Sequence, residues 1–138
     1  KDTLFKVPVL GWWLRSIGVV PVDRSSPRGV VGQMIDRLQV ARERDQFFWV
    51  VLAPEGTRGY RAYWRSGFYQ VALKADVPLG LAYIDFKRKE VGVDSFLQLS
   101  GDEDADMAAI AARLGHREGF HPEQAAPIRL RDEKVAAT

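Results

Sequence analysis

The sequence lacks cysteine altogether, and His116 and His121 are its two histidines. Without cysteine, a disulfide framework and metal sites built on thiolates are both excluded. Two histidines leave little from which to build another kind of metal centre, so we expect no metal. The glycine-rich nucleotide loops, the G-x-S-x-G nucleophile elbow and the H-E-x-x-H zinc motif are absent as well.

Long apolar runs are also missing, since no stretch approaches the roughly 20 residues that a membrane-spanning helix requires. The composition is otherwise that of an ordinary folded protein, with 138 residues of which 46% are hydrophobic and 28% charged. A chain of this length can build one core without staples, and no linker interrupts it. We therefore expect a single domain over residues 1–127, followed by a charged tail over residues 128–138 that frays.

The positive charge is concentrated in the first half of the chain. Residues 1–74 contain 12 lysines and arginines against 6 acidic residues, a net charge of +6, whereas residues 75–138 have a net charge of −4. A basic half favours an anionic partner, and three classes are open: a phosphate-bearing substrate, a membrane surface or a nucleic acid. Because the arginines cluster at the ends of predicted strands and not along one helix face, we expect no nucleic-acid partner.

Apolar periodicity predicts helices that alternate with strands. The helices are expected at residues 7–17, 31–44, 64–75 and 105–114, with a last short helix from His121. The strands are expected at residues 19–22, 47–53 and 79–86, and residues 91–93 return as a hairpin partner after a solvated basic turn at residues 87–89. This alternation predicts the α/β class, with a mixed, mostly parallel sheet flanked by helices.

The apolar run at residues 47–53 is followed directly by Pro54-Glu-Gly-Thr-Arg58 and then by Arg61 and Arg65. An uninterrupted β-branched and aromatic run is typical of a strand buried on both faces, and ligands bind beyond the carboxyl ends of such strands. Gly56 lets the backbone turn tightly, and arginine presents a planar fork suited to phosphate. A strand followed by a merely solvated loop is the competing interpretation.

A second charged pair, Asp23-Arg24, follows the strand predicted at residues 19–22. If the two strands are parallel, their charged ends meet at one edge of the sheet, where Arg24 and Arg58 could hold a phosphate monoester. Backbone N–H groups around Gly56 would add to such an anion site. The acidic residues of the two clusters, Asp23 and Glu55, could instead only orient the arginines beside them.

Four segments resemble, in the right order, the motifs of one known family. Gly18-Val-Val-Pro-Val-Asp-Arg24 resembles the second sequence block of the phospholipid/glycerol acyltransferases, the 1-acylglycerol-3-phosphate acyltransferase-like family, and Pro54-Glu-Gly-Thr-Arg58 resembles the third. Val77-Pro78 resembles the start of the fourth block, and Lys1-Asp-Thr-Leu-Phe-Lys-Val-Pro8 resembles the run that precedes the second. Residues 64–69 and 82–92 suggest a less characterised bacterial branch of this family.

The resemblance implies a membrane-associated α/β enzyme with a glycerol-3-phosphate acyltransferase-like fold. Such an enzyme moves a fatty acyl group from acyl-CoA or acyl carrier protein to the hydroxyl of a (lyso)glycerol phosphate in phospholipid synthesis, and it needs no cofactor. It would be cytoplasmic and peripheral to the cytoplasmic face of the membrane. By position, the acceptor-phosphate residues of the family correspond here to Lys1, Arg24, Glu55, Gly56, Thr57 and Arg58.

One part of the family pattern is missing from these 138 residues. In the family, an H-x4-D motif supplies a histidine that deprotonates the acceptor hydroxyl and an aspartate that orients it, and no H-x4-D occurs here. We therefore expect this block to precede Lys1, so that the chain is an incomplete and inactive piece that keeps the acceptor-phosphate site. Two alternatives are open: a non-catalytic phosphate- or lipid-binding domain and, less favoured, a nucleic-acid-binding module.

Overall fold

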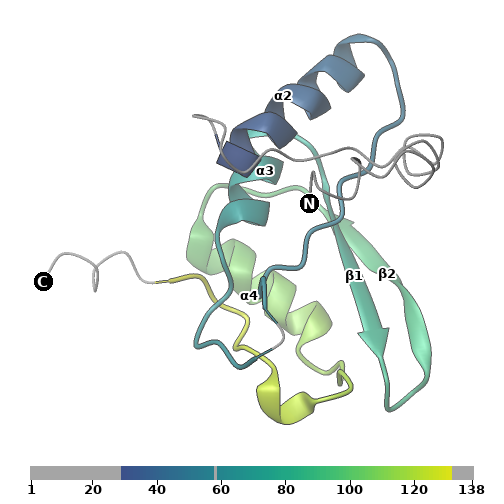
Figure 1. The fold of residues 1–138 in the computed structure, drawn as a ribbon, viewed down its shortest axis with the longest axis vertical. Helices are drawn as coiled ribbons and strands as arrows, with labels where there is room; N and C mark the ends of the chain where they lie inside the picture. Colours follow the sequence, from purple (N-terminus) through teal and green to yellow (C-terminus); the bar gives the residue numbers. More distant parts are fainter. Residues whose placement is uncertain (1–28, 58, 132–138) are drawn as a thin grey trace, which may run out of the picture. The chain divides into compact units, whose positions relative to one another are not determined.

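The computed structural model describes residues 29–57 and 59–131 (Figure 1). The chain divides into two compact units, residues 1–48 and residues 49–138, and the single domain expected over residues 1–127 stays a prediction. The helix expected at residues 7–17 and the strand expected at residues 19–22 lie outside the described residues. In the part of the chain that is described, no helix is long and apolar enough to cross a membrane.

The first unit contains the helix α2 (Gly29–Glu43), which confirms the helix expected in this region. It is followed by Asp45 in the left-handed region, with φ 50°. There the Gln46 N–H donates to the Ala41 carbonyl at 2.8 Å, and the Asp45 N–H donates to the Arg42 carbonyl at 3.1 Å. These two bonds form a Schellman motif, which satisfies carbonyl groups that have no partner inside the helix.

The buried strand expected at residues 47–53 is not formed, and this prediction is wrong. These residues have no regular secondary structure, and the side chains of Phe47 and Val51 are each 87% exposed. A strand buried on both faces needs hydrogen-bonded neighbours and packed side chains on each side. Among the described residues the sheet has two strands, which pair with each other, so residues 47–53 add no third strand to it.

The sheet is an antiparallel hairpin of β1 (Leu79–Asp85) and β2 (Glu90–Leu97). It confirms the strand and the hairpin partner expected here, and the turn between them places Lys89 in the left-handed region, with φ 58°. So short a turn connects only antiparallel strands, and the expected mixed sheet includes this antiparallel pair. The described residues form a small mixed helix and strand fold, and the mostly parallel sheet is not found in them.

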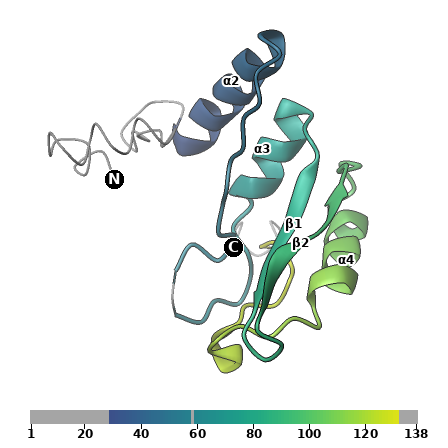
Figure 2. The same ribbon diagram turned by 90° about the vertical axis from the view of Figure 1, so that its right-hand side faces the viewer.

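Three helical elements accompany the hairpin: α3 (Gly67–Ala75), α4 (Glu103–Leu114) and the short 3-10 helix η2 (Pro122–Gln124). Figures 1 and 2 show α4 running beside the hairpin. Asp102 caps α4 by accepting a hydrogen bond from the Ala105 N–H at 3.1 Å, the bond that an aspartate typically makes at this position. The expected start of α3 at residue 64 is too early, because the N–H groups of residues 64 and 65 donate to carbonyls outside the helix.

One hydrophobic core joins α3, the hairpin, α4 and residues 125–131, which we name the C-terminal segment. Ile110 of α4 is 0% exposed and Leu81 of β1 is 3% exposed. Leu130 lies in the region expected to be a charged tail, yet it is 5% exposed and belongs to this core. The buried cluster consists of Phe68, Tyr69, Ala72, Leu81, Leu99, Met107, Ile110 and Leu130.

A buried polar cluster, the polar anchor, ties α4 to α3 and to the loop before α4. The Asp106 carboxylate is 5% exposed and accepts hydrogen bonds from the Tyr69 hydroxyl at 2.8 Å and from the N–H groups of Ser100 and Gly101. Burial by itself raises the pKa of Asp106, but these hydrogen bonds outweigh it and hold the pKa below its usual value. Burial, followed by the hydrogen bond to Asp106, raises the pKa of Tyr69 to about 12. At neutral pH the anchor therefore joins an ionised carboxylate to a protonated tyrosine.

Candidate functional site

The Pro-Glu-Gly-Thr-Arg motif lies in residues 54–65, the motif loop, which leads into α3. The two ends of this loop are joined, because the Arg65 N–H donates to the Pro54 carbonyl at 2.9 Å. Gly56 has φ 64°, a left-handed conformation that glycine adopts without steric penalty. A Cβ atom added to Gly56 would lie 3.0 Å from Nε of Arg65. The glycine therefore serves both the turn and the packing of the Arg65 side chain over it.

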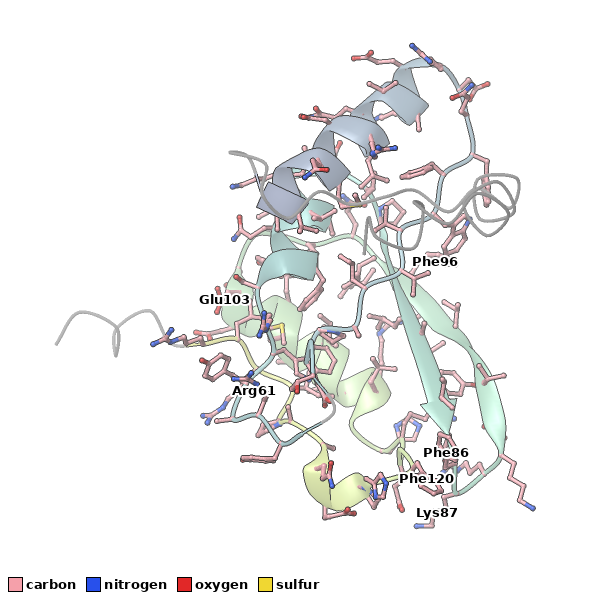
Figure 3. All side chains as sticks on the ribbon, viewed as in Figure 1. Arg61, Phe86, Lys87, Phe96, Glu103 and Phe120 are labelled. Carbon is pink, nitrogen blue, oxygen red and sulfur yellow. The ribbon has the colours of Figure 1, made fainter. Side chains whose placement is uncertain are left out.

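Two arginines of the motif loop, Arg61 and Arg65, are exposed, and Figure 3 shows Arg61 on this loop. Among the described residues, no carboxylate lies within ion-pair distance of either guanidinium. A guanidinium is always charged and carries five N–H donors. These two side chains therefore keep charge and donors available for an anionic ligand.

Two further cations reach the motif loop from the C-terminal segment, which the sequence analysis did not assign to the site. Figures 1 and 2 show this segment running beside the loop. Nε of Arg129 donates to the Ala62 carbonyl at 3.1 Å, and the guanidinium carbon of Arg131 lies 5.8 Å from the centre of the Tyr63 ring. The alternation of apolar and basic residues over positions 128–131 is the signal that could have revealed this, because it is typical of a segment with one buried side.

Glu55 is the one acidic residue of the motif loop. Its side chain is half-buried, and its Oε1 accepts a hydrogen bond from the Ala126 N–H at 2.9 Å. No cation among the described residues lies within ion-pair distance of this carboxylate. The idea that Glu55 orients a neighbouring arginine therefore finds no support at Arg61 or Arg65.

The sequence-predicted site residues divide into two groups. Glu55, Gly56 and Thr57 lie next to one another in the motif loop, where Thr57 is exposed and its Oγ1 accepts a hydrogen bond from the Gly59 N–H at 3.3 Å. The other three lie outside the described residues: Lys1, Arg24 and Arg58. Their convergence on the motif loop stays a prediction.

Lys87 and His121, a basic and a histidine residue outside the motif loop, are engaged in local contacts. At the exposed turn of residues 87–89, Lys87 pairs with Glu118 at 2.5 Å, as expected for a solvated hairpin tip. Beside this turn the rings of Phe86 and Phe120 contact each other, with centroids 5.2 Å apart (Figure 3). His121 is exposed, and its Nδ1 lies 3.2 Å from a carboxylate oxygen of Glu123. In the described part of the chain, no group of three or more acidic or histidine side chains could hold a metal ion.

Comparison with known proteins points to one family. A family model described as Acyltransferase matches residues 1–80. A chloroplastic 1-acyl-sn-glycerol-3-phosphate acyltransferase of Brassica napus is 32% identical over 82 residues, and one of Arabidopsis thaliana is 31% identical over 80 residues. These matches cover 57% and 56% of this chain but 23% and 22% of those proteins, so the chain spans less than a quarter of their length. No solved structure matches the chain. The motif loop lies inside the family match, and the C-terminal segment lies outside it.

Proposed function

This chain belongs to the acyltransferase family, and we propose that it supplies the acceptor-phosphate site of an enzyme that acylates a glycerol phosphate. In this reaction the acceptor hydroxyl oxygen attacks the carbonyl carbon of an acyl thioester on coenzyme A or acyl carrier protein. The ester bond forms as the carbon–sulfur bond breaks, the hydroxyl proton passes to a base, and the thiol leaves. The two relatives are named for 1-acyl-sn-glycerol-3-phosphate, which supports a (lyso)glycerol phosphate as the acceptor.

The observation that carries this proposal is the presence of four arginines on the motif loop and on the segment beside it. Arg61 and Arg65 come from the loop itself, and Arg129 and Arg131 come from the C-terminal segment. None of the four has a carboxylate within ion-pair distance among the described residues. Four cations on two adjoining segments give this part of the surface a positive potential, which attracts an anion. A phosphate monoester suits such a site, because arginine can donate two parallel hydrogen bonds to it.

The catalytic base is not among the motifs of these 138 residues, which contain no H-x4-D. His116 and His121 both lie outside the motif loop. We propose that the chain alone has no acyltransferase activity, because without a base the hydroxyl stays a poor nucleophile and general-base help is worth about 10²–10⁴-fold. The role proposed for these residues is to bind and orient the acceptor.

The wider biological setting is proposed on the same family-level basis. The enzyme would act at the cytoplasmic face of a membrane, would need no cofactor and would have no nucleic-acid partner. Both relatives are chloroplastic plant proteins, so the bacterial branch expected from the sequence stays a prediction. The choice between coenzyme A and acyl carrier protein as the donor is open in the same way.

Binding to the 138-residue chain tests the acceptor site independently of catalysis. We expect sn-glycerol 3-phosphate to bind in isothermal titration calorimetry, whereas glycerol, which lacks the phosphate, should not. Arg61→Ala combined with Arg65→Ala should weaken binding about tenfold or more, because charged hydrogen bonds are lost. Arg88→Ala combined with Lys89→Ala is the matched control, since it removes the same charge from the hairpin tip and should leave binding nearly unchanged.

Two results would contradict the proposal. Equal weakening by both pairs of substitutions would mean that binding follows only the overall charge of the chain. Salt-dependent binding of duplex DNA that is tighter than binding of lysophosphatidate vesicles would favour the nucleic-acid alternative.

A further inference from the structure

The motif loop is tied to the C-terminal segment by three hydrogen bonds between residues more than 60 positions apart in the sequence. The Ala126 N–H donates to Glu55 Oε1 at 2.9 Å, across 71 positions of sequence. The Trp64 N–H donates to the Arg129 carbonyl at 2.7 Å, and Nε of Arg129 donates to the Ala62 carbonyl at 3.1 Å. The loop is therefore held at both halves, near its start through Glu55 and near its end through residues 62 and 64.

The C-terminal segment is in turn fixed to the hydrophobic core. Ala126 is 7% exposed and Leu130 is 5% exposed, and Ile128 packs against the buried cluster. Trp64, at the end of the loop, contacts Phe68 of the core edge to face, with ring centroids 5.8 Å apart. The motif loop, which carries exposed cations, is thus held in position by the buried side chains of the C-terminal segment and by the contact of Trp64 with the core.

The surroundings of Glu55 do not suit a group that contacts phosphate. One of its oxygens is already bound to the Ala126 N–H, and a carboxylate placed against a phosphate would repel it. The next residue, Gly56, makes the left-handed turn over which Arg65 packs. Holding Glu55 in place therefore holds the turn and the arginine beside it.

We infer that Glu55 is a positioning residue, whose carboxylate fixes the motif loop on the C-terminal segment, and that it is not a ligand of the acceptor phosphate. The identity of the ligand in this inference rests on the proposed function. The inference assigns a role in the site to residues 125–131, which lie beyond the family match at residues 1–80.

Substitutions at the two ends of one hydrogen bond test the inference, with sn-glycerol 3-phosphate as the probe. Glu55→Gln keeps an oxygen that can accept from the Ala126 N–H, so its dissociation constant should stay close to that of the unaltered chain. Glu55→Ala removes the acceptor and should weaken binding about tenfold or more. Glu123→Ala, which removes the same charge from the neighbouring η2, is the matched control and should not weaken binding.

Ala126→Pro removes the donor while Glu55 is kept. The preceding Ala125 has φ −65° and ψ 130°, a conformation that a residue before proline adopts readily. This variant should weaken binding as much as Glu55→Ala does. The double variant should be no weaker than either single variant, because both changes break the same bond.

Hydrogen exchange of the Ala126 amide, followed by nuclear magnetic resonance, gives a second measurement that needs no ligand. Exchange should become about tenfold faster or more in Glu55→Ala and stay slow in Glu55→Gln. If Glu55→Ala does not fold, Glu55→Asp gives the same comparison, since its carboxylate is one methylene shorter. If the unaltered chain does not bind the probe but exchange follows this pattern, the proposed function fails and the positioning role of Glu55 is supported.

Three outcomes would overturn the inference. Loss of binding in Glu55→Gln as large as in Glu55→Ala would make the carboxylate itself a ligand. Unchanged or tighter binding in Glu55→Ala would mean that the loop keeps its position without this bond. Unchanged exchange of the Ala126 amide in Glu55→Ala would mean that the bond does not hold the C-terminal segment.

Discussion

The polar anchor and the motif loop are both built on charged groups, but they compensate those charges in opposite ways. In the anchor, Asp106 is 5% exposed and its carboxylate is surrounded by donors from Tyr69, Ser100 and Gly101. In the motif loop, Arg61 and Arg65 are exposed and no carboxylate among the described residues pairs with them. A buried charge must be satisfied inside the protein, whereas an exposed one can be satisfied by water until a ligand arrives.

The difference separates the part of the molecule that provides stability from the part to which we assign acceptor binding in the proposed function. The anchor lies where α3, α4 and the loop between the hairpin and α4 meet, so damage there should unfold the core. The motif loop contributes few buried side chains and is held mainly by hydrogen bonds to the C-terminal segment. Damage there should change ligand affinity more than the free energy of unfolding, as is common for binding sites on rigid scaffolds.

The largest effect on the anchor side is expected for Asp106→Ala. This change leaves the Tyr69 hydroxyl and the N–H groups of Ser100 and Gly101 without their acceptor. Losing several buried hydrogen bonds at once should lower the free energy of unfolding by about 3–5 kcal/mol. Urea unfolding followed by circular dichroism measures this loss.

Asp104→Ala is the control for that measurement, because it removes an exposed acid from the same first turn of α4. It should cost only about 0.3–1 kcal/mol, the worth of an acid near a helix N-terminus. Equal losses for the two variants would mean that the buried hydrogen bonds add nothing beyond the helix dipole.

The next largest effect is expected for Arg58→Lys on the binding side. Arg58 lies outside the described residues, and its role is inferred from the family motif. A lysine cannot reproduce a two-point contact to phosphate, and losing one charged hydrogen bond costs about 1.5–3 kcal/mol, or roughly 10- to 150-fold in acceptor affinity. Arg88→Lys at the hairpin tip should leave both acceptor affinity and stability unchanged. In a form that contains the catalytic base, an unchanged Michaelis constant for the acceptor with a raised one for the donor would contradict the phosphate role.

The sequence predicted best the features that depend on neighbouring residues. The helices α2 and α4 lie where the apolar periodicity of their own residues predicts them, because that periodicity relates residues only three or four positions apart. Residues 47–53 were wrongly assigned to a strand because apolarity is a property of the segment, whereas a strand also requires a neighbour to pair with. The apolar pattern of residues 47–53 carries no information on whether an adjacent strand is present to pair with them, and none pairs with them among the described residues.

In the candidate site, too, the sequence predicts features that depend on neighbouring residues and misses contacts between residues far apart in the chain. The Pro-Glu-Gly-Thr-Arg motif predicts that Glu55 and Gly56 belong to the site. It also predicts a tight turn at Gly56, and the structure has a left-handed turn there. The contacts of Glu55 with Ala126 and of Ala62 with Arg129 join residues more than 60 positions apart. No local pattern encodes such a pairing, so the charge of residues 128–138 by itself predicts a tail.

A smaller effect is expected for Gly56→Ala in the motif loop. A residue with a side chain pays about 1–2 kcal/mol in the left-handed region, and the new Cβ would push against Nε of Arg65 at 3.0 Å. Gly29→Ala is the matched control, because Gly29 has φ 61° and no atom within 4 Å of an added Cβ. Both variants should lose similar stability, and only Gly56→Ala should also weaken binding of sn-glycerol 3-phosphate. Equal weakening of binding by Gly29→Ala would remove the role given to Arg65.

The smallest effect is expected for Tyr69→Phe, which removes one donor from the anchor and leaves the bonds from Ser100 and Gly101 in place. At neutral pH it should lower the free energy of unfolding by about 0.5–1.5 kcal/mol, without changing acceptor affinity. Tyr60→Phe, the same change on an exposed tyrosine of the motif loop, should leave stability unchanged. The pH dependence gives the sharper test, because the pKa of Tyr69 is about 12 in the folded chain against 10.0 for a free tyrosine. Between these values ionisation favours the unfolded state, so the unaltered chain should lose its advantage over Tyr69→Phe as the pH rises from 10 to 12. An advantage that stays constant or grows over this range, in urea unfolding at each pH, would mean that Tyr69 is not a buried donor to Asp106.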